Sequence, residues 1–371
     1  MFQKSIVIAG ALLFYLIGSP KVFSLFGPKA VQVIDSLRKE NLSRRDEELI
    51  ERGYYENLVS VDRFNPQLWE RYQRPDKVPL SQSKAVRRTG DFFRYELVPS
   101  MEMRFHGATL RTNRWGMRDK DYEMTRPPHT LRIALLGGSV EMGDGVENQD
   151  IFESLLEERL NREAKGTPYG AYEILNFAVW GYRPMDQVAV LERKVWSFKP
   201  DAIFFGAHTR DLKRGTVGLV AKVLGADDTP YAYLKDTLSK AGVDRETPKF
   251  VASRRLLPFA GELLFRSYRY IVEECRKRGV TPVWVFLPRV DEEPRNEDFD
   301  ELIQLATKAG FTILDLTAAY DGYDRELLKV APWDDHPNAQ GHRLLAERLY
   351  KAIQENEALR VLLGLGSPAL G

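Results

Sequence analysis

The chain has 371 residues, of which 43% are hydrophobic and 29% are charged, and its formal net charge is +1. This composition is typical of a globular protein, and the length suits one large domain or two ordinary ones. A net charge so close to zero provides no global field to attract nucleic acid, so we expect no nucleic-acid partner. The single cysteine, Cys275, excludes an intramolecular disulfide, and no Cys/His cluster has zinc-ligand spacing. The chemistry predicted below needs no metal and no organic cofactor.

The first segment, 1–27, differs from the rest of the chain. Lys4 precedes an apolar run over 5–18, which has the length and the cationic start of a signal peptide, but no small-residue cleavage site follows. The run is shorter than the roughly 20 residues that span a membrane, unless 22–27 extend it into an uncleaved anchor. We expect a signal peptide or membrane anchor here, and hence an extracytoplasmic or membrane-anchored protein with possible membrane association. The basic residues from Lys21 onward weakly oppose export, and a buried N-terminal helix is the alternative.

Residues 28–127 form a predicted accessory region. Apolar residues at helical spacing predict a charged amphipathic helix over 29–55. Farther along, aromatic residues and arginines are frequent and periodicity is weak, with short strands expected at 92–97 and 108–112. The arginines of this stretch are expected to form surface or inter-domain ion pairs.

From 128 to 358 apolar, β-favouring runs alternate with helical patterns, which is typical of a parallel sheet covered by helices on both faces. Strands are predicted at 131–136, 173–179, 201–206, 281–287 and 311–316, and helices at about 150–163, 184–197, 258–278, 296–309 and 338–355. The predicted fold class is α/β, a three-layer α/β/α arrangement around a five-stranded parallel sheet. Residues 359–371 are expected to form a flexible tail.

A long segment over 211–258 interrupts this alternation. Glycine, proline and aspartate residues in it surround one or two expected short helices. Because long connections at the carboxyl edge of a sheet are usually functional or disordered, we expect a lid or a substrate wall here.

Four segments carry polar side chains to the expected carboxyl edge of the sheet, where ligands of open α/β folds bind. They are 137–140, where two glycines and Ser139 follow an apolar strand; 176–182, a strand running into a glycine turn; 206–211; and 332–342, just before the last helix.

These segments contain the residue types of nucleophilic catalysis. A serine hydroxyl becomes an effective nucleophile when a base takes its proton, and histidine is the usual base near neutral pH. His336 can act as the base for Ser139, and either Asp334 or Asp335 can fix the tautomer of the histidine. The tetrahedral intermediate also needs donors for its oxyanion, which the backbone N–H groups of Ser139 and Gly181 can provide.

The sequence gives weaker support for other functions of the same residues. The turn at 137–139 could bind a phosphate, but it lacks the glycine patterns of nucleotide-binding loops, and Glu141 stands where a G-x-S-x-G nucleophile elbow needs glycine. Trp180 and Tyr182 are equally compatible with a sugar site and with buried packing. A structural role, or no assigned role, is expected for Cys275, Asp211, His342, His106, His129, Glu141 and Asp144.

Taken in order, these segments resemble the SGNH (GDSL-type) hydrolases, in the bacterial branch with an N-terminal extension. Residues 137–140 match the nucleophile block of the family, 176–182 its glycine block, 199–211 its third block and 336–342 its base block, while 113–119 are similar to a segment often found upstream. The resemblance covers about 105–356. It implies the SGNH/flavodoxin-like sheet described above and an activity of ester hydrolysis or acyl transfer, commonly on carbohydrates or lipids.

One departure from the family pattern concerns the oxyanion. Arg210 stands where the family has an asparagine that donates to the oxyanion. The donor is therefore lost, or it is replaced by Arg210, Thr209 or His208. Loss of one such donor typically slows catalysis by about 10²–10³-fold.

A second departure concerns the triad acid. Trp333 lies three residues before His336, where the family has its aspartate. The two-residue spacing from Asp334 to His336 resembles that of SGNH-like polysaccharide acetyltransferases, and it favours Asp334 over Asp335.

The sequence therefore predicts a serine esterase or deacylase that acts on an acylated small molecule, glycan or lipid. Its triad is Ser139, His336 and Asp334, and its oxyanion donors are Ser139, Gly181 and Arg210. One alternative is an O-acyltransferase acting on a cell-envelope or exopolysaccharide glycan, motivated by the Asp-x-His spacing. Another is a catalytically weak glycan- or lipid-binding protein on the same fold, motivated by Arg210.

Overall fold

The computed structural model of the protein describes residues 79–224, 230–291, 295 and 297–366. All of these residues belong to one compact unit, Asn65–Gly371. The expected signal peptide or anchor over 1–27 and the expected helix over 29–55 lie outside the described residues. In the described part of the chain, no helix is long and apolar enough to cross a membrane.

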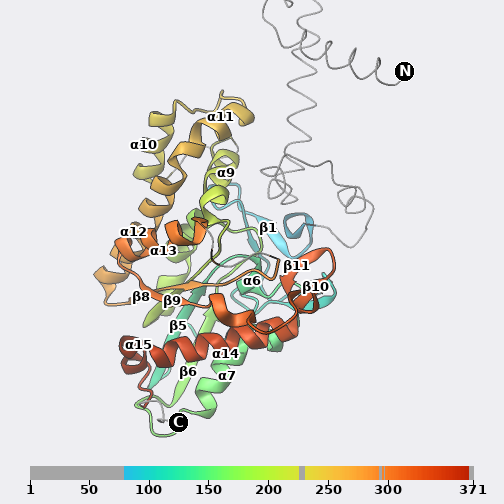
Figure 1. Ribbon diagram of the computed structural model, residues 1–371, viewed down its shortest axis with the longest axis vertical. Coiled ribbons are helices and arrows are strands. Elements are labelled where there is room, and N and C mark those ends of the chain that lie inside the picture. Colours follow the sequence, from blue (N-terminus) through green and yellow to red (C-terminus); the bar gives the residue numbers. More distant parts are fainter. Residues whose placement is uncertain (1–78, 225–229, 292–294, 296, 367–371) are drawn as a thin grey trace, which may run out of the picture. The chain divides into compact units, whose positions relative to one another are not determined.

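A five-stranded parallel sheet forms the centre of this unit (Figure 1). Its strands are β5 (Thr130–Leu136), β6 (Ala171–Asn176), β7 (Ala202–Ala207), β8 (Thr281–Phe286) and β9 (Thr312–Asp315). They lie in the order β6-β5-β7-β8-β9, which is the doubly wound order of flavodoxin-like folds. The switch point of that order falls between β5 and β7, where such folds bind their ligands.

The apolar runs of the sequence become strands because both faces of the sheet are buried. Every residue of β5 and β7 is buried. Alternate side chains enter two different cores, with Ala134 and Leu136 on one face and Ile133 and Leu135 on the other.

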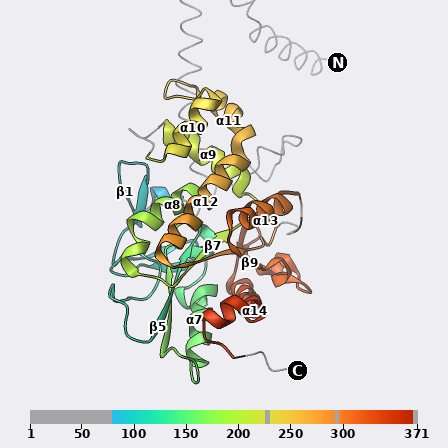
Figure 2. The ribbon, with the colours of Figure 1, turned by 90° about the vertical axis from the view of Figure 1, so that its left-hand side faces the viewer.

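Helices cover each face, as Figures 1 and 2 show. One core is lined by α8 (Pro184–Arg193), α9 (Asp211–Val223), α12 (Ala260–Arg278) and α13 (Glu297–Ala309), and the other by α7 (Phe152–Arg162) and α14 (Ala339–Glu355). The side chain of Asn338 caps α14 by accepting from the backbone N–H groups of Gln340 and Gly341. The predicted three-layer α/β/α fold is confirmed.

The interruption predicted over 211–258 is more regular than expected. It is helical, with α9 followed by α10 (Ala232–Ala241) and α11 (Lys249–Leu256), which extend away from the sheet in both ribbon views (Figures 1 and 2). The breakers Gly242 and Pro248 lie between these helices, and Leu234 and Leu238 are buried. Its role as a lid stays a prediction.

The accessory region packs into the same core as the sheet. Its described part forms two antiparallel hairpins, β1 (Val86–Arg88) with β2 (Tyr95–Leu97) and β3 (Glu102–Phe105) with β4 (Ala108–Arg111). The strand expected at 92–97 is therefore shorter, and β1 and β3 were not foreseen. Phe92 and Phe93 are buried in the core that contains α8 and α12.

The end of the described chain is ordered, which corrects the expectation of a tail from 359. Helix α15 (Glu357–Leu362) follows α14, and both Leu359 and Leu363 are fully buried. The hydroxyl of Tyr172 donates to the carbonyl of Leu363 over 2.6 Å. Apolar burial holds this segment on the α7 face of the sheet.

Candidate active site

Ser139 lies at the carboxyl end of β5, at the switch point of the sheet. It is the first residue of a single-turn helix, α6 (Ser139–Met142), which begins directly after Gly138. A side chain at Gly137 or at Gly206 on β7 would collide with the side chain of Glu141. The glycines therefore make room for Glu141 beneath the serine turn.

His336 and Asp334 reach Ser139 from a hairpin that the sequence did not predict. Strand β10 (Lys329–Ala331) pairs antiparallel with β11 (Asp334–Pro337), and β11 packs against α6. The Nε2 atom of His336 lies 2.7 Å from the Oγ of Ser139. Its Nδ1 lies 2.6 Å from the Oδ1 of Asp334, which also accepts from the backbone N–H of His336 at 3.2 Å.

The charges of this group favour a basic imidazole. Burial favours the neutral ring, but the hydrogen bond to Asp334 and the charges of Asp144 and Asp334 raise the pKa of His336 above its ordinary value. Burial also opposes ionisation of Asp334, yet the hydrogen bond from His336 and its charge hold the pKa of Asp334 well below its usual range. At neutral pH the orienting group is therefore a carboxylate, as a triad requires.

The alternative triad acid, Asp335, faces elsewhere. Its carboxylate lies 3.6 Å from the guanidinium of Arg289, which itself donates to Asp291 over 2.9 Å. The structure therefore brings Asp334, the residue favoured by the sequence, onto Nδ1 of His336.

The three predicted oxyanion donors have different surroundings. The backbone N–H of Ser139 lies in the first turn of α6, where N–H groups have no intrahelical acceptor. Gly181 has a φ of +80°, and its turn is held beside α6 because the backbone N–H of Trp180 contacts the Sδ of Met142 at 3.3 Å. Arg210 donates to Asp291 over 2.9 Å, which directs part of its guanidinium to that carboxylate.

His208, another candidate donor, is engaged beneath the site. Its Nε2 lies 2.9 Å from Oε1 of Glu141 and its Nδ1 lies 3.0 Å from the carbonyl of Leu287. Oε2 of Glu141 accepts from the backbone N–H of Gly138 at 2.7 Å. His208 and Glu141 therefore support the serine turn, and the ring nitrogens of His208 do not face the oxyanion position.

Two other buried polar residues fix α6 and the loop after it. The side-chain amide of Asn176 donates to the carbonyl of Glu141 over 2.8 Å. The guanidinium of Arg118, only 2% exposed, donates to the carbonyls of Met142, Gly143 and Val146. Burial lowers the pKa of Arg118 to about 10, so it stays cationic at neutral pH. This loop-holding role corrects the expectation of a surface or inter-domain ion pair for Arg118.

The remaining singled-out residues are structural. Tyr182 is buried, packs against Phe93 and donates to the carbonyl of Tyr95, so packing rather than a sugar surface describes it. His342 is fully buried and accepts from the backbone N–H of Phe152 at 3.2 Å. Cys275 is buried in α12, and the carboxylate of Asp211 accepts from the backbone N–H of His208.

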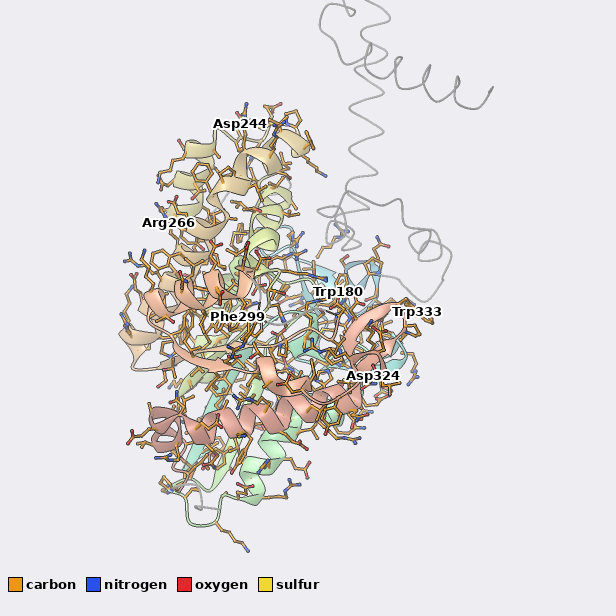
Figure 3. All side chains as sticks on the ribbon, viewed as in Figure 1. Trp180, Asp244, Arg266, Phe299, Asp324 and Trp333 are labelled. Atoms are coloured by element: carbon orange, nitrogen blue, oxygen red, sulfur yellow. The ribbon has the colours of Figure 1, made fainter. Side chains whose placement is uncertain are left out.

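Two tryptophans belong to the part of the fold that carries the triad. In Figure 3 the labelled Trp180 and Trp333 lie on the side of the ribbon that carries β10 and β11, whereas Asp244 lies at the far end of the helical insertion. Both indoles are half-buried. Among the described residues, no group of histidine, cysteine, aspartate and glutamate side chains is arranged to hold a metal ion.

Comparisons with known proteins find likeness in structure only. No family model matches the sequence, and no curated protein matches it. One solved structure that it resembles is that of TesA, with 14% sequence identity and a TM-score of 0.41, over 62% of this chain and 99% of that one. Another is an acetyl xylan esterase, AlAXEase, with 15% identity and a TM-score of 0.38, over 60% of this chain and 99% of that one. A third is a catalytic mutant of Axe2, an acetylxylan esterase from Geobacillus stearothermophilus, with 15% identity and a TM-score of 0.37, over 64% of this chain and 95% of that one. At these identities, and at TM-scores below 0.5, the likenesses say nothing about the activity or the family of this chain.

Proposed function

We propose that the protein is a serine ester hydrolase that works through an acyl-enzyme. The observation that carries the proposal is the continuous hydrogen-bond chain from Ser139 Oγ to His336 Nε2 at 2.7 Å and from His336 Nδ1 to Asp334 at 2.6 Å. A serine, a base and a carboxylate in this order are the parts of a nucleophilic triad.

In the first half-reaction Ser139 Oγ attacks the ester carbonyl while its proton passes to Nε2 of His336. The positive charge that forms on the imidazole is stabilised by the carboxylate of Asp334, and the proton on Nδ1 stays on the ring. His336 then gives the Nε2 proton to the leaving alcohol, and the acyl group remains on Ser139.

The developing oxyanion needs hydrogen-bond donors in fixed positions. We assign the backbone N–H groups of Ser139 and Gly181 to this role, with Arg210 as a third donor. Water, deprotonated by His336, then attacks the acyl-enzyme and releases the acid. We expect the natural ester to be an acylated carbohydrate or lipid, by the resemblance to the SGNH hydrolases.

A fluorophosphonate probe tests the nucleophile directly, because it reacts with activated serines. We expect the full chain to be labelled at Ser139, as located by mass spectrometry. Ser139→Ala and His336→Ala should both abolish labelling and the hydrolysis of p-nitrophenyl esters. His129→Ala, a change at an exposed histidine, is the matched control and should behave as the wild type.

If Ser139→Ala hydrolyses esters as fast as the wild type, the proposal is wrong. If the folded wild type is neither labelled nor active, the binding-protein alternative motivated by Arg210 becomes the better explanation. Saturable binding of a glycan or a lipid without turnover would then support it.

An O-acyltransferase is the second candidate, favoured by the two-residue spacing from Asp334 to His336. In this case the hydroxyl of a glycan, rather than water, takes the acyl group from Ser139. Adding oligosaccharide acceptors to an acyl-donor assay should then produce acylated oligosaccharide faster than free acid. Hydrolysis alone across a panel of acceptors would favour the esterase.

We also propose that the protein acts outside the cytoplasm or at a membrane, because of the apolar run at 5–18. Cell fractionation of the full chain, compared with a chain in which Leu12 and Leu13 are replaced by Lys, tests this. Equal recovery of both chains in the cytoplasmic fraction would contradict the proposal.

A further inference from the structure

His336 is flanked by two carboxylates rather than one. The Oδ1 of Asp334 lies 2.6 Å from Nδ1 of His336, and the Oδ2 of Asp144 lies 3.7 Å from the same nitrogen. Asp144 lies two residues after the end of α6, and its side chain is only 1% exposed, whereas that of Asp334 is 20% exposed. A buried carboxylate carries a large desolvation cost unless it is paired, so its surroundings identify what it does there.

His106 also contacts the carboxylate of Asp144. Its Nδ1 lies 2.9 Å and 3.0 Å from the two carboxylate oxygens, so the carboxylate cannot turn without losing a hydrogen bond. His106 lies at the turn between β3 and β4, with a φ of +46°, and its ring stacks on Phe105 at 3.8 Å. Because a carboxylate only accepts, the proton of this hydrogen bond lies on Nδ1 of His106.

The charged groups around Asp144 come from several elements. His336 and Asp334 belong to β11, and Arg289 follows β8. His106 lies at the turn between β3 and β4. Arg118, which follows β4 in the chain, donates to carbonyls of the loop after α6, and Glu147 lies in that loop. The charge of Asp144 helps raise the pKa of His336, while that of Arg289 opposes it.

We propose that Asp144, held by His106, is a second positioning carboxylate of the catalytic histidine. It stabilises the imidazolium of His336, and it accepts the hydrogen bond from Nδ1 of His336 when Asp334 is lost. The inference rests on the proposed function, because it assigns a role relative to the base of that reaction. No proton moves to Asp144 in the normal cycle, since the Nδ1 proton stays on the ring. His106 acts through Asp144 and is likewise a positioning residue.

This arrangement predicts an unusual result for the triad acid. In an ordinary triad, replacing the aspartate lowers kcat by about 10⁴-fold. Here a small rotation of the ring brings Nδ1 to Asp144, so Asp334→Ala should lose only about 10–100-fold, well short of that triad loss. Alanine is the informative replacement for Asp334. The backbone N–H of His336 could hold the amide oxygen of an asparagine in the place of Oδ1, and that oxygen would still accept from Nδ1 of His336.

A double-mutant cycle measures how far Asp144 replaces Asp334 as the hydrogen-bond acceptor of His336. We expect Asp144→Asn to lower kcat/KM about tenfold in the wild type and by a further factor of about 10²–10³ in the Asp334→Ala background. Glu147→Gln is the matched control, because Glu147 also joins the hairpin, through Thr109 and Arg104, but lies away from Nδ1. It should leave both backgrounds within about twofold. Equal factors for Asp144→Asn in the two backgrounds would overturn the inference.

Side-chain NMR titration of the histidines supplies a readout that does not need turnover. The chain has five histidines, and single substitutions assign them. Asp144→Asn should lower the pKa of His336, and Glu147→Gln should not. An unchanged pKa of His336 in folded Asp144→Asn would also overturn the inference.

His106→Asn is the second variant, and it keeps Asp144. Asparagine tolerates the left-handed backbone at this position but is too short to hold the carboxylate as histidine does. It should lower kcat/KM by a similar factor to Asp144→Asn, and the two changes together should cost little more than either alone. If the losses of kcat/KM in the two single variants multiply in the double variant, His106 acts independently of Asp144, which contradicts the role assigned to His106.

The two proposals fail in different ways. If Ser139→Ala retains full ester turnover, the proposed function is wrong, whatever the titration shows. If Ser139 is the labelled nucleophile but Asp144→Asn changes neither the titration of His336 nor the rate in the Asp334→Ala background, only the second carboxylate is wrong.

Discussion

The imidazole of His208 and the carboxylate of Glu141 form a buried ion pair directly beneath the nucleophile turn. Nε2 of His208 lies 2.9 Å from Oε1 of Glu141, while Nδ1 faces the carbonyl of Leu287. Since both ring nitrogens face acceptors, the ring carries both protons. Burial opposes this, but the charge and hydrogen bond of Glu141 raise the pKa of His208 above its ordinary value.

Replacing only His208 should therefore lower the free energy of unfolding substantially. His208→Leu leaves the carboxylate of Glu141 buried without its counter-charge, and we expect a loss of about 3–5 kcal/mol in the free energy of unfolding. The double change Glu141→Met and His208→Leu should cost less, because it removes both charges. Urea denaturation measures each variant. Arg162→Met, in an exposed helical pair with Glu158, should change stability by less than about 0.5 kcal/mol. A similar small loss in His208→Leu would show that Glu141 is not charged.

The space that Glu141 occupies makes Gly206 a sensitive position. A β-carbon there would collide with the carboxylate of Glu141, which is held by Gly138 and His208 and cannot swing aside. We expect Gly206→Ala to destabilise the protein by about 1–3 kcal/mol, as overpacking does, and to reduce Ser139 labelling. Gly215→Ala, on α9, meets nothing within 4 Å and should be neutral or slightly stabilising. Thermal unfolding compares the two, and equal melting temperatures would contradict the packing argument.

The two neighbouring aspartates of β11 should differ in their effect on activity. Asp334→Ala removes the acceptor on Nδ1 of His336 and should lower kcat/KM by about tenfold or more. Asp335→Asn weakens a 3.6 Å contact with Arg289 and leaves the acceptor on Nδ1 of His336 in place, so it should stay within about threefold of the wild type. Steady-state hydrolysis of a p-nitrophenyl ester measures both. A larger loss in Asp335→Asn would make Asp335 the triad acid.

Activity and stability should respond to pH in opposite directions around His336. Activity needs the neutral base, so kcat/KM should fall on the acid side with a midpoint above about 6.5, the ordinary pKa of histidine. A raised pKa in the folded state means that the native protein binds this proton more tightly than the unfolded chain. The corresponding stability is therefore present below pH 6.5 and is lost as the pH rises through the pKa of folded His336. Comparing urea midpoints of the wild type and His336→Gln from pH 5 to 9 checks the sign, and a wild-type acid limb below pH 6 would contradict it.

Sequence reasoning worked where one run of residues carried the signal. The strands at 131–136 and 201–206 could be predicted because both faces of β5 and β7 are buried, which gives each strand a nearly continuous apolar run. The position of Ser139 at the ligand-binding edge of the sheet followed from the rule that ligands bind at the carboxyl ends of parallel strands, whereas His336 reaches it from an antiparallel hairpin.

It failed where contacts join separate elements. The strands of the β10–β11 hairpin have only three and four residues, which is too short for an alternating apolar pattern to be recognised. The contact of His106 with Asp144 joins the accessory region to the loop after α6, and no local pattern reports such a pairing. The support of Ser139 by Glu141 and His208 was missed for the same reason, although both residues closely follow predicted strands.

The separation of the proposed nucleophile and the proposed base along the chain has a consequence for synthesis of the protein. Ser139 and His336 are 197 positions apart, and the hairpin that carries the base comes only after the last strand of the sheet. A ribosome releases the serine long before the histidine, so a nascent or prematurely terminated chain has a nucleophile with no base. Under the proposed triad, reaction of Ser139 with a fluorophosphonate therefore requires a chain synthesised as far as His336, and shorter chains should not react.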